Sequence, residues 1–116
     1  MLRYEVGQYY RTHHDMSEQD NAMAAGARVY TFFLYLSHVE AGGETNFPRL
    51  GLDVAPRKGR ALLWPSVLSD APTRRDDRTY HQAKDVLKGV KYAANAWIHS
   101  FNFRVPNRWG CSGAFD

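Results

Sequence analysis

The stretch YYRTHHDM, residues 9–16, brings together the two side-chain types, imidazole and carboxylate, that most often bind metal ions. In an extended chain, residues i and i+2 point to the same face, so His13 and Asp15 can offer a nitrogen and an oxygen to one point. His14, between them, points the other way. Because so short a pattern is common by chance, a metal site here requires a third ligand from elsewhere in the chain.

The candidates for that third ligand are three other histidines, His38, His81 and His99. His38 ends an apolar run, His81 begins a strand-like segment after a charged loop, and His99 follows Trp97 by two residues. Chemistry alone favours His81 only slightly. Two histidines and one carboxylate would form a facial triad, which leaves positions open for substrate and dioxygen and is typical of non-haem Fe(II) oxygenases.

The segment KGVKYAANAWIHSFNFRV, residues 88–105, predicts one long strand, or a strand with a bend, whose two faces differ. One face is small and polar and suits the lining of a cavity: Lys91, Ala93, Asn95 and Trp97. The other face is apolar or aromatic and is expected to pack against an outer layer: Val90, Tyr92, Ala94, Ala96 and Ile98. A lysine that points into the fold needs an anion, because an unpaired buried ammonium is strongly disfavoured. The alternative is that Lys91 extends to the rim.

The first third of the chain predicts strands separated by one loop. Residues 2–15 predict a strand, a bend at Gly7 and a second strand that ends in the His-x-Asp pattern. Residues 16–27 lose the aromatic content, so we expect a mobile loop there rather than a short helix. Residues 28–39, RVYTFFLYLSHV, are aromatic and β-branched with almost no polar break, which predicts a strand buried on both faces.

The middle of the chain predicts loops around one hairpin. Residues 40–50 contain a Gly-Gly pair and a proline, which mark a turn or loop. Residues 52–64 predict a hairpin with Gly59 at its tip, and residues 65–80 are irregular and charged. Several short strands separated by turn signals predict an all-β, barrel-like sandwich.

Composition limits the protein to one modest domain. The chain has 116 residues, 44% of them hydrophobic and 14% aromatic, and a formal net charge of +3. Its basic residues are dispersed, so we expect no nucleic-acid interface, and no apolar stretch approaches membrane-spanning length. The single cysteine, Cys111, excludes an internal disulfide and a zinc site built from cysteines.

Four segments, in order, resemble the prolyl 4-hydroxylases of the 2-oxoglutarate- and Fe(II)-dependent dioxygenase superfamily. They are YEVGQYYRTHHD (residues 4–15), RVYTFFLYLSHVEAGGETNFP (28–48), APRKGRALLW (55–64) and HQAKDVLKGVKYAANAWIH (81–99). The resemblance implies an all-β fold with a double-stranded β-helix, or jelly-roll, core. It also implies that His13, Asp15 and His81 hold the iron, which decides among the histidines.

The same resemblance assigns roles to other residues. It implies that Lys91 pairs with the distal carboxylate of 2-oxoglutarate, with hydrogen bonds from Thr45 and from the hydroxyl of Tyr4. Positions that line the active site or approach the substrate correspond to Tyr10, Arg28 and Trp97. Gly42 and Gly43 are expected to make the turn that aims Thr45. We expect the remaining histidines, His14, His38 and His99, to be surface or packing residues.

The implied reaction is hydroxylation of a C–H bond, with Fe(II) as cofactor, 2-oxoglutarate and O2 as cosubstrates, succinate and CO2 as products, and ascorbate as reductant. The expected substrate is peptidyl proline in a peptide or protein, hydroxylated at carbon 4. Two alternatives are a hydroxylase of a free amino acid or other small molecule, and a truncated, non-catalytic module that binds metal and 2-oxoglutarate. Residues 16–27 and 66–80 flank the two parts of the metal motif and are expected to form a lid.

The family domain carries supporting helices and strands before the YEVGQ motif, and we expect these N-terminal elements to be missing from this chain. We therefore expect residues 1–116 to form one catalytic domain, with a core of about residues 2–103 and a tail of residues 104–116. Cys111, in that tail, is expected to be an incidental thiol. Members of the family often reside in the endoplasmic reticulum, but this sequence indicates no compartment and no oligomeric state.

Overall fold

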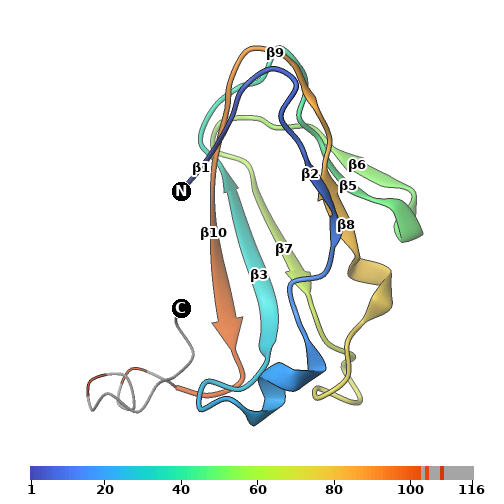
Figure 1. Cartoon of the computed structure of the whole chain (residues 1–116), viewed down its shortest axis with the longest axis vertical. Helices are drawn as coiled ribbons and strands as arrows, with labels where there is room; N and C mark the ends of the chain where they lie inside the picture. The colour runs from blue at the N-terminus through green and yellow to red at the C-terminus, as the bar shows by residue number, and fades with distance from the viewer. Residues whose placement is uncertain (103, 105–107, 109–116) are drawn as a thin grey trace.

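The chain folds, in this computed structural model, as two antiparallel sheets that face each other (Figure 1). The structure describes residues 1–102, 104 and 108. One sheet has the strand order β1 (Leu2–Tyr4), β10 (Lys91–His99), β3 (Arg28–Tyr35), β7 (Ala61–Pro65). The other has the order β2 (Tyr10–His13), β8 (His81–Ala83), β5 (Thr45–Phe47), β6 (Leu52–Val54). A two-stranded ribbon of β4 (Ala41–Gly42) and β9 (Val86–Lys88) lies at the end where the sheets converge.

The connections make this sandwich a jelly roll. Of the steps between successive strands of the two four-stranded sheets, only β5 to β6 stays within one sheet, and every other step crosses to the opposite sheet. The mostly β composition and the two-sheet architecture confirm the predicted all-β, double-stranded β-helix fold. No helix among the described residues is long and apolar enough to cross a membrane.

Strand β10 positions the interior. Its pairing with β3 sets Ala93 opposite Tyr35 and Trp97 opposite Thr31, so that side chains alternate between the inner and outer faces of the sheet. Lys91 and Ala93 are buried on the inner face, and Lys91, Asn95 and Trp97 line the same cavity, as predicted for this face of the strand. Across the sandwich, Phe47 and Trp64 pack edge to face at 5.3 Å between ring centroids and form the aromatic part of the core.

The outer face of the same sheet differs from the prediction. Strand β3 was expected to be buried on both sides, but Tyr30 is 44% and Phe32 36% exposed. The expectation that the outer residues of β10 pack against a further layer is also wrong for the described residues, because Tyr92 and Ile98 are exposed. The reason is that no described element covers this face, so an apolar run alone does not show how many sides of a strand are covered.

The predicted hairpin at residues 52–64 is wrong. Strand β6 pairs with β5, whereas β7 pairs with β3 in the opposite sheet. The turn at Gly59 therefore crosses between the sheets, and the Gly59 N–H donates to the Tyr35 carbonyl oxygen at 2.9 Å. Two strand-like runs with a glycine between them indicate a reversal of direction, but they do not decide which partner each strand takes.

Two segments predicted as loops contain regular structure. Residues 40–50 contain β4, β5 and the 3-10 helix η2 (Pro48–Leu50), because strands of two or three residues are too short for a periodic signal. Residues 16–27 contain the 3-10 helix η1 (Glu18–Ala22) rather than only a loop. Ser17 begins that helix with a capping box: its hydroxyl accepts from Gln19 N–H, and the Asp20 carboxylate accepts from Ser17 N–H.

The last predicted strand is shorter than its segment. Strand β10 ends at His99, after a register shift between Ile98 and His99. Beyond it, Ser100 N–H and Phe101 N–H donate to the carbonyl oxygens of Ala27 and Ala25. Cys111 and most of the predicted tail at residues 104–116 lie outside the described residues.

Candidate metal centre

Strand pairing brings the metal motif together. Strands β2 and β8 run antiparallel with His13 opposite His81, and Asp15 follows two residues after the end of β2. One ligand atom from each of these three residues lies within 4.8 Å of the other two. Asp15 Oδ1 is 3.4 Å from His13 Nε2, and Asp15 Oδ2 is 3.7 Å from His81 Nε2. Among the described residues this is the one group of three or more such side chains that could hold a metal ion.

Both histidines are oriented by the backbone in the same way. His13 Nδ1 lies 3.0 Å from the Arg11 carbonyl oxygen, and His81 Nδ1 lies 3.0 Å from the Thr79 carbonyl oxygen. Each Nδ1–H donates to the carbonyl two residues earlier, which turns the Nε2 atom of each ring toward Asp15. Such a second hydrogen bond fixes the tautomer and ring orientation that a metal-binding histidine needs.

Asp15 is held from two directions. The Thr31 hydroxyl donates to Asp15 Oδ2 at 2.6 Å, and Arg28 Nη1 donates to the Asp15 backbone carbonyl at 3.2 Å. Burial would raise the pKa of Asp15, but hydrogen bonds from His13 and Thr31 and the neighbouring His81 lower it below its ordinary value, so the carboxylate is ionised. Thr31 was not predicted from the sequence, although it is the one short polar side chain in the aromatic and apolar run of residues 29–35.

The two histidines differ in their surroundings. Burial disfavours the His13 cation, yet hydrogen bonds to Asp15 and to the Arg11 carbonyl raise its pKa above the ordinary value. Burial is stronger for His81 and lowers its pKa. His81 also packs against Trp64, with ring centroids 4.8 Å apart.

Lys91 lies inside the fold rather than at the rim. The side chain is 1% exposed, and its Nζ donates to the Gly43 carbonyl oxygen at 2.7 Å. The rings of Tyr4, Phe33 and Tyr35 surround the ammonium at 5.6 to 5.8 Å. Burial lowers the pKa of Lys91 to about 8. Within the described part of the chain, no carboxylate lies within 4 Å of this ammonium, so two of its three donors are available to a ligand.

Thr45 and Tyr4 also face this region. Thr45 is buried on β5, and its Oγ1 accepts a hydrogen bond of 2.6 Å from the Tyr35 hydroxyl, which leaves the Thr45 proton free to be donated. Burial raises the pKa of Tyr4, so that its hydroxyl stays protonated and can also donate. Tyr35, which sequence analysis did not single out, thus orients the threonine.

One cavity of about 410 Å³ reaches the three candidate ligands and also Lys91, Thr45 and Tyr4. Its lining includes every residue proposed from the sequence: Tyr4, Tyr10, His13, Asp15, Arg28, Thr45, His81, Lys91 and Trp97. These residues come from six different strands and from the segment after β2, so only the tertiary fold brings them to one cavity. Their individual roles stay predictions.

Two features mark the mouth of the cavity. The Arg28 guanidinium stacks on the Trp97 ring at 3.8 Å, and the Tyr10 ring meets His13 edge-on at 4.4 Å. Trp97 is 40% and Tyr10 50% exposed, so both rings are accessible to a ligand. The two predicted lid segments contact each other, because Asn21 Nδ2 donates to the Thr73 carbonyl oxygen at 2.8 Å; closure by these loops stays a prediction.

The other three histidines differ in their exposure and in their hydrogen bonds. His38 is exposed, and His99 Nδ1 hydrogen-bonds to the Gly26 carbonyl oxygen at 3.0 Å. His14, expected to be a surface or packing residue, is instead half-buried and hydrogen-bonded on both ring nitrogens. Burial lowers its pKa, so its imidazole is neutral at neutral pH.

Comparison with known proteins places this site in a family. Residues 1–99 match the 2OG-Fe(II) oxygenase superfamily. The chain is 37% identical over 113 residues to prolyl 4-hydroxylase subunit alpha-1 of Homo sapiens, covering 91% of this chain and 21% of that protein. It is 36% identical over 132 residues to the probable prolyl 4-hydroxylase 7 of Arabidopsis thaliana, covering 96% of this chain and 41% of that protein.

A solved structure agrees with the sequence relatives. The viral collagen prolyl hydroxylase vCPH from Paramecium bursaria Chlorella virus-1, in its 2OG complex, superimposes with a TM-score of 0.76 at 34% identity. The match covers 86% of this chain and 56% of that one, so this chain spans only part of the length of each relative. With its fold, its His-Asp-His site and these matches in agreement, the chain belongs to the 2OG-Fe(II) oxygenase superfamily, among its prolyl 4-hydroxylase-like members.

Proposed function

We propose that residues 1–116 act as one catalytic unit, a 2-oxoglutarate- and Fe(II)-dependent dioxygenase that hydroxylates peptidyl proline. The observation that carries the proposal is the sharing of one cavity by the His13–Asp15–His81 group and the buried, cationic Lys91. The first can hold a metal and the second an anion. A metal beside an anion anchor is what a chelating dicarboxylate cosubstrate requires.

The residues fit Fe(II). Two Nε2 atoms and one carboxylate converge, the histidine tautomers are set by carbonyl oxygens, and the carboxylate is ionised. Nitrogen and oxygen ligands in this two-to-one ratio are typical of non-haem Fe(II) sites that leave coordination positions open. The Thr31 hydroxyl and the Arg11 and Thr79 carbonyls are the outer groups that hold the three ligands in place.

The residues also fit 2-oxoglutarate. We propose that the distal carboxylate of the cosubstrate accepts hydrogen bonds from Lys91, Thr45 and Tyr4. Burial of the Lys91 ammonium without a carboxylate partner is unfavourable, and an anion that enters the cavity would offset this unfavourable free energy. Each hydrogen bond to a charged group contributes about 1.5–3 kcal/mol.

When bound, Fe(II) with 2-oxoglutarate and O2 would supply the oxidising chemistry: one atom of O2 would enter the cosubstrate, which loses CO2 and becomes succinate, and the other atom would be inserted into the substrate C–H bond. The chain's own part is to orient the cosubstrate and to exclude water from the cavity. Lys91 and Thr45 fix one end of the cosubstrate, while Trp64 and Phe47 close the floor beside His81 against water. Ascorbate is the proposed reductant that keeps the iron in its Fe(II) state.

Peptidyl proline is the proposed substrate for two reasons. The named relatives are prolyl 4-hydroxylases and a collagen prolyl hydroxylase. At the mouth of the cavity, the exposed rings of Tyr10 and Trp97 and the stacked Arg28 offer apolar faces for a pyrrolidine ring and a donor for a peptide carbonyl. His13, the more exposed ligand, lies on this side of the centre.

The test is succinate formation by the full chain with Fe(II), ascorbate and 2-oxoglutarate, with and without a proline-rich peptide. The peptide should stimulate succinate release and gain the mass of one oxygen atom. His81→Ala should lose both iron and activity, whereas His38→Ala, which changes an exposed histidine, should keep both.

Other outcomes would replace specific parts of the proposal. Stimulation by free proline or another small molecule, but by no peptide, would show a different substrate class. Binding of 2-oxoglutarate without succinate from any substrate would show a non-catalytic module. Activity in His81→Ala would show that the ligand set is wrong.

A further inference from the structure

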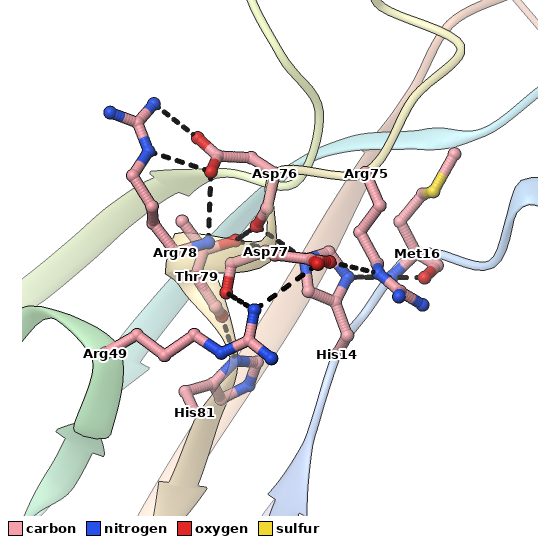
Figure 2. Close-up of polar contacts among 9 residues, drawn as sticks. All are labelled: His14, Met16, Arg49, Arg75, Asp76, Asp77, Arg78, Thr79 and His81. Carbon is pink, nitrogen blue, oxygen red and sulfur yellow. Dashed lines mark hydrogen bonds and ion pairs between the residues drawn. The ribbon is translucent and has the colours of Figure 1, made fainter.

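His14 lies between the two segments that carry the candidate metal ligands (Figure 2). Its Nδ1 accepts a hydrogen bond of 3.0 Å from the Met16 N–H, on its own segment. Its Nε2 lies 3.1 Å from Thr79 Oγ1 and 3.1 Å from the Asp76 carbonyl oxygen, on the segment that leads to His81. These partners are 65 and 62 residues away in sequence, so the imidazole is a cross-link of high sequence separation.

The hydrogen bonds are consistent with one neutral tautomer. The shorter contact of Nδ1 is with the Met16 N–H, at 3.0 Å, against 3.2 Å to the Met16 carbonyl oxygen, so Nδ1 accepts and the ring proton resides on Nε2. That proton faces Thr79 Oγ1 and the Asp76 carbonyl oxygen, both at 3.1 Å. The Thr79 hydroxyl in turn donates to the Asp76 carbonyl oxygen at 3.0 Å. A side chain with an acceptor at one end and a donor at the other is needed to make this connection, and a purely apolar ring cannot replace it.

The far end of the cross-link is a stiff turn. The 3-10 helix η3 (Asp77–Thr79) begins at Asp76, whose buried carboxylate accepts from the Arg78 N–H at 3.1 Å. The same carboxylate accepts two hydrogen bonds from the Arg78 guanidinium, at 2.9 and 2.7 Å. On its other side, Asp77 accepts from Arg75 at 2.8 Å and pairs with Arg49 at 3.3 Å. The turn is therefore ordered by its own bonds, and His14 attaches it to the chain after β2.

The His14 cross-link connects to candidate metal ligands at both of its ends. His14 stands between His13 and Asp15 in the chain. Thr79, which it contacts, presents the carbonyl oxygen that accepts from His81 Nδ1 at 3.0 Å. The path from the His13–Asp15 segment to the ring of His81 thus runs through two hydrogen bonds and one residue. The β2–β8 ladder supplies a second connection, but it lies on the other side of the histidine pair.

We propose that His14 is a positioning residue, whose imidazole holds the His13–Asp15 segment and the η3 turn at the spacing that the metal requires. The proposal rests on the proposed function, in which His13, Asp15 and His81 are the ligands. His14 itself is not one of the three candidate ligands. Without its cross-link, the three ligands remain present, but their convergence is no longer held from this side.

The experiment compares three variants of the full chain, titrated with Co(II) as the probe metal. His14→Gln can place a donor near the position of Nε2 and so keep the bond to Thr79. His14→Asn reaches only the position of Nδ1 and keeps the local bond to Met16. His14→Phe keeps the aromatic packing against Tyr80, whose ring meets that of His14 at 5.1 Å, and loses both bonds. The readouts are Co(II) affinity, the Co(II) d–d spectrum and thermal unfolding of the metal-free chain.

We expect His14→Asn and His14→Phe to weaken Co(II) binding by about 10–100-fold, the range seen when outer-shell partners of metal ligands are removed. His14→Gln should stay within about threefold of the unchanged chain and keep its d–d spectrum. Rescue of Co(II) affinity and of the d–d spectrum by glutamine but not by asparagine, in variants that thermal unfolding shows to be folded at the titration temperature, separates positioning from general folding.

Two results would overturn the inference alone. These are wild-type affinity in His14→Asn, or equal losses in the glutamine and asparagine variants. If His14→Phe does not fold, the comparison of the glutamine and asparagine variants still tests whether the bond to Thr79 positions the ligands. Failure of the unchanged chain to bind Co(II) at all would instead overturn the proposed metal site, and the inference with it.

Discussion

The ammonium of Lys91 donates to the carbonyl oxygen of Gly43 at 2.7 Å, across the gap between β10 and the turn that leads into β5. Gly42 and Gly43 both have positive φ, at 76° and 73°, and this pair of left-handed residues turns the Gly43 carbonyl toward the cavity. The expected role of the pair was to aim Thr45. The pair has a second effect, because the Gly43 carbonyl oxygen also holds the Lys91 ammonium at the end of the cavity.

The affinity for 2-oxoglutarate should fall as pH rises above about 8. Burial lowers the pKa of Lys91 to about 8 in the ligand-free chain, so below that pH the ammonium is already charged when a carboxylate arrives. Above it, binding must first take up a proton, which weakens the apparent affinity by up to about tenfold per pH unit. Calorimetric titration of the metal-loaded chain between pH 6.5 and 9 measures this slope.

Two variants serve as controls for Lys91. Lys91→Arg carries a charge that does not titrate in this range, so its pH profile should be flat. Lys91→Ala should weaken 2-oxoglutarate binding by roughly 10–100-fold, as expected for loss of a hydrogen bond to a charged group, with Co(II) affinity retained. A flat profile in the unchanged chain, or unaltered cosubstrate affinity in Lys91→Ala, would reject the anchor role.

Thr31→Val should weaken the metal site with little effect on the fold. The substitution keeps the β-branched shape on β3 but removes the hydroxyl that donates to Asp15 Oδ2 at 2.6 Å. We expect Co(II) affinity to drop about tenfold, because the carboxylate loses the group that orients it. Thr31→Ser, which restores the hydroxyl, should recover most of the affinity. Equal affinity in the valine and serine variants would contradict this role.

Gly42→Ala should destabilise the chain far more than Gly59→Ala. Both glycines have positive φ, so an alanine at either position costs about 1–2 kcal/mol of backbone strain. At Gly59 a new Cβ meets open space, whereas at Gly42 it would overlap the Asp85 carbonyl oxygen and crowd the Leu87 backbone. Overpacking of this kind adds about 1–3 kcal/mol. Urea unfolding of the two variants measures the difference, and equal losses would show that the turn can shift.

Trp97→Ala should raise the KM for a proline-rich peptide by roughly threefold to tenfold, the value of one aromatic contact. Trp97 lies at the mouth of the cavity under the Arg28 guanidinium, 3.8 Å from its ring. Ile98→Ala is the matched control, since the neighbouring side chain is exposed on the opposite face of β10. Steady-state kinetics with varied peptide measure the change. Equal KM values in the two variants would place the peptide elsewhere.

Sequence periodicity predicted the inner face of β10 well, and the outer faces of β3 and β10 poorly. Alternation alone tells which residues share a face, and it placed Lys91, Asn95 and Trp97 together. It does not tell whether another element covers the opposite face. For the same reason, the two runs around Gly59 were predicted as one hairpin although they belong to different sheets.

The groups around the candidate ligands were the least predictable from sequence. Thr31, Tyr35 and His14 act on Asp15, Thr45 and Thr79 through hydrogen bonds that join distant parts of the chain. Their residue types are common in strands and loops, and nothing in the neighbouring sequence indicates which distant group each of them contacts. Only the packed sandwich places each of these donors within reach of its acceptor.

The sequence by itself determined the local chemistry: His13 and Asp15 on the same side of an extended segment, and Lys91 on the inner face of a long strand, because both follow from the two-residue repeat of β structure. Residue types and spacing left the third histidine open, and the family resemblance implied His81; only the tertiary structure placed its side chain beside the other two. The β2–β8 ladder sets His81 opposite His13, whereas His38 is exposed and His99 contacts Gly26. Strand pairing depends on contacts between remote segments, and those contacts exist only when the two sheets have closed around the cavity.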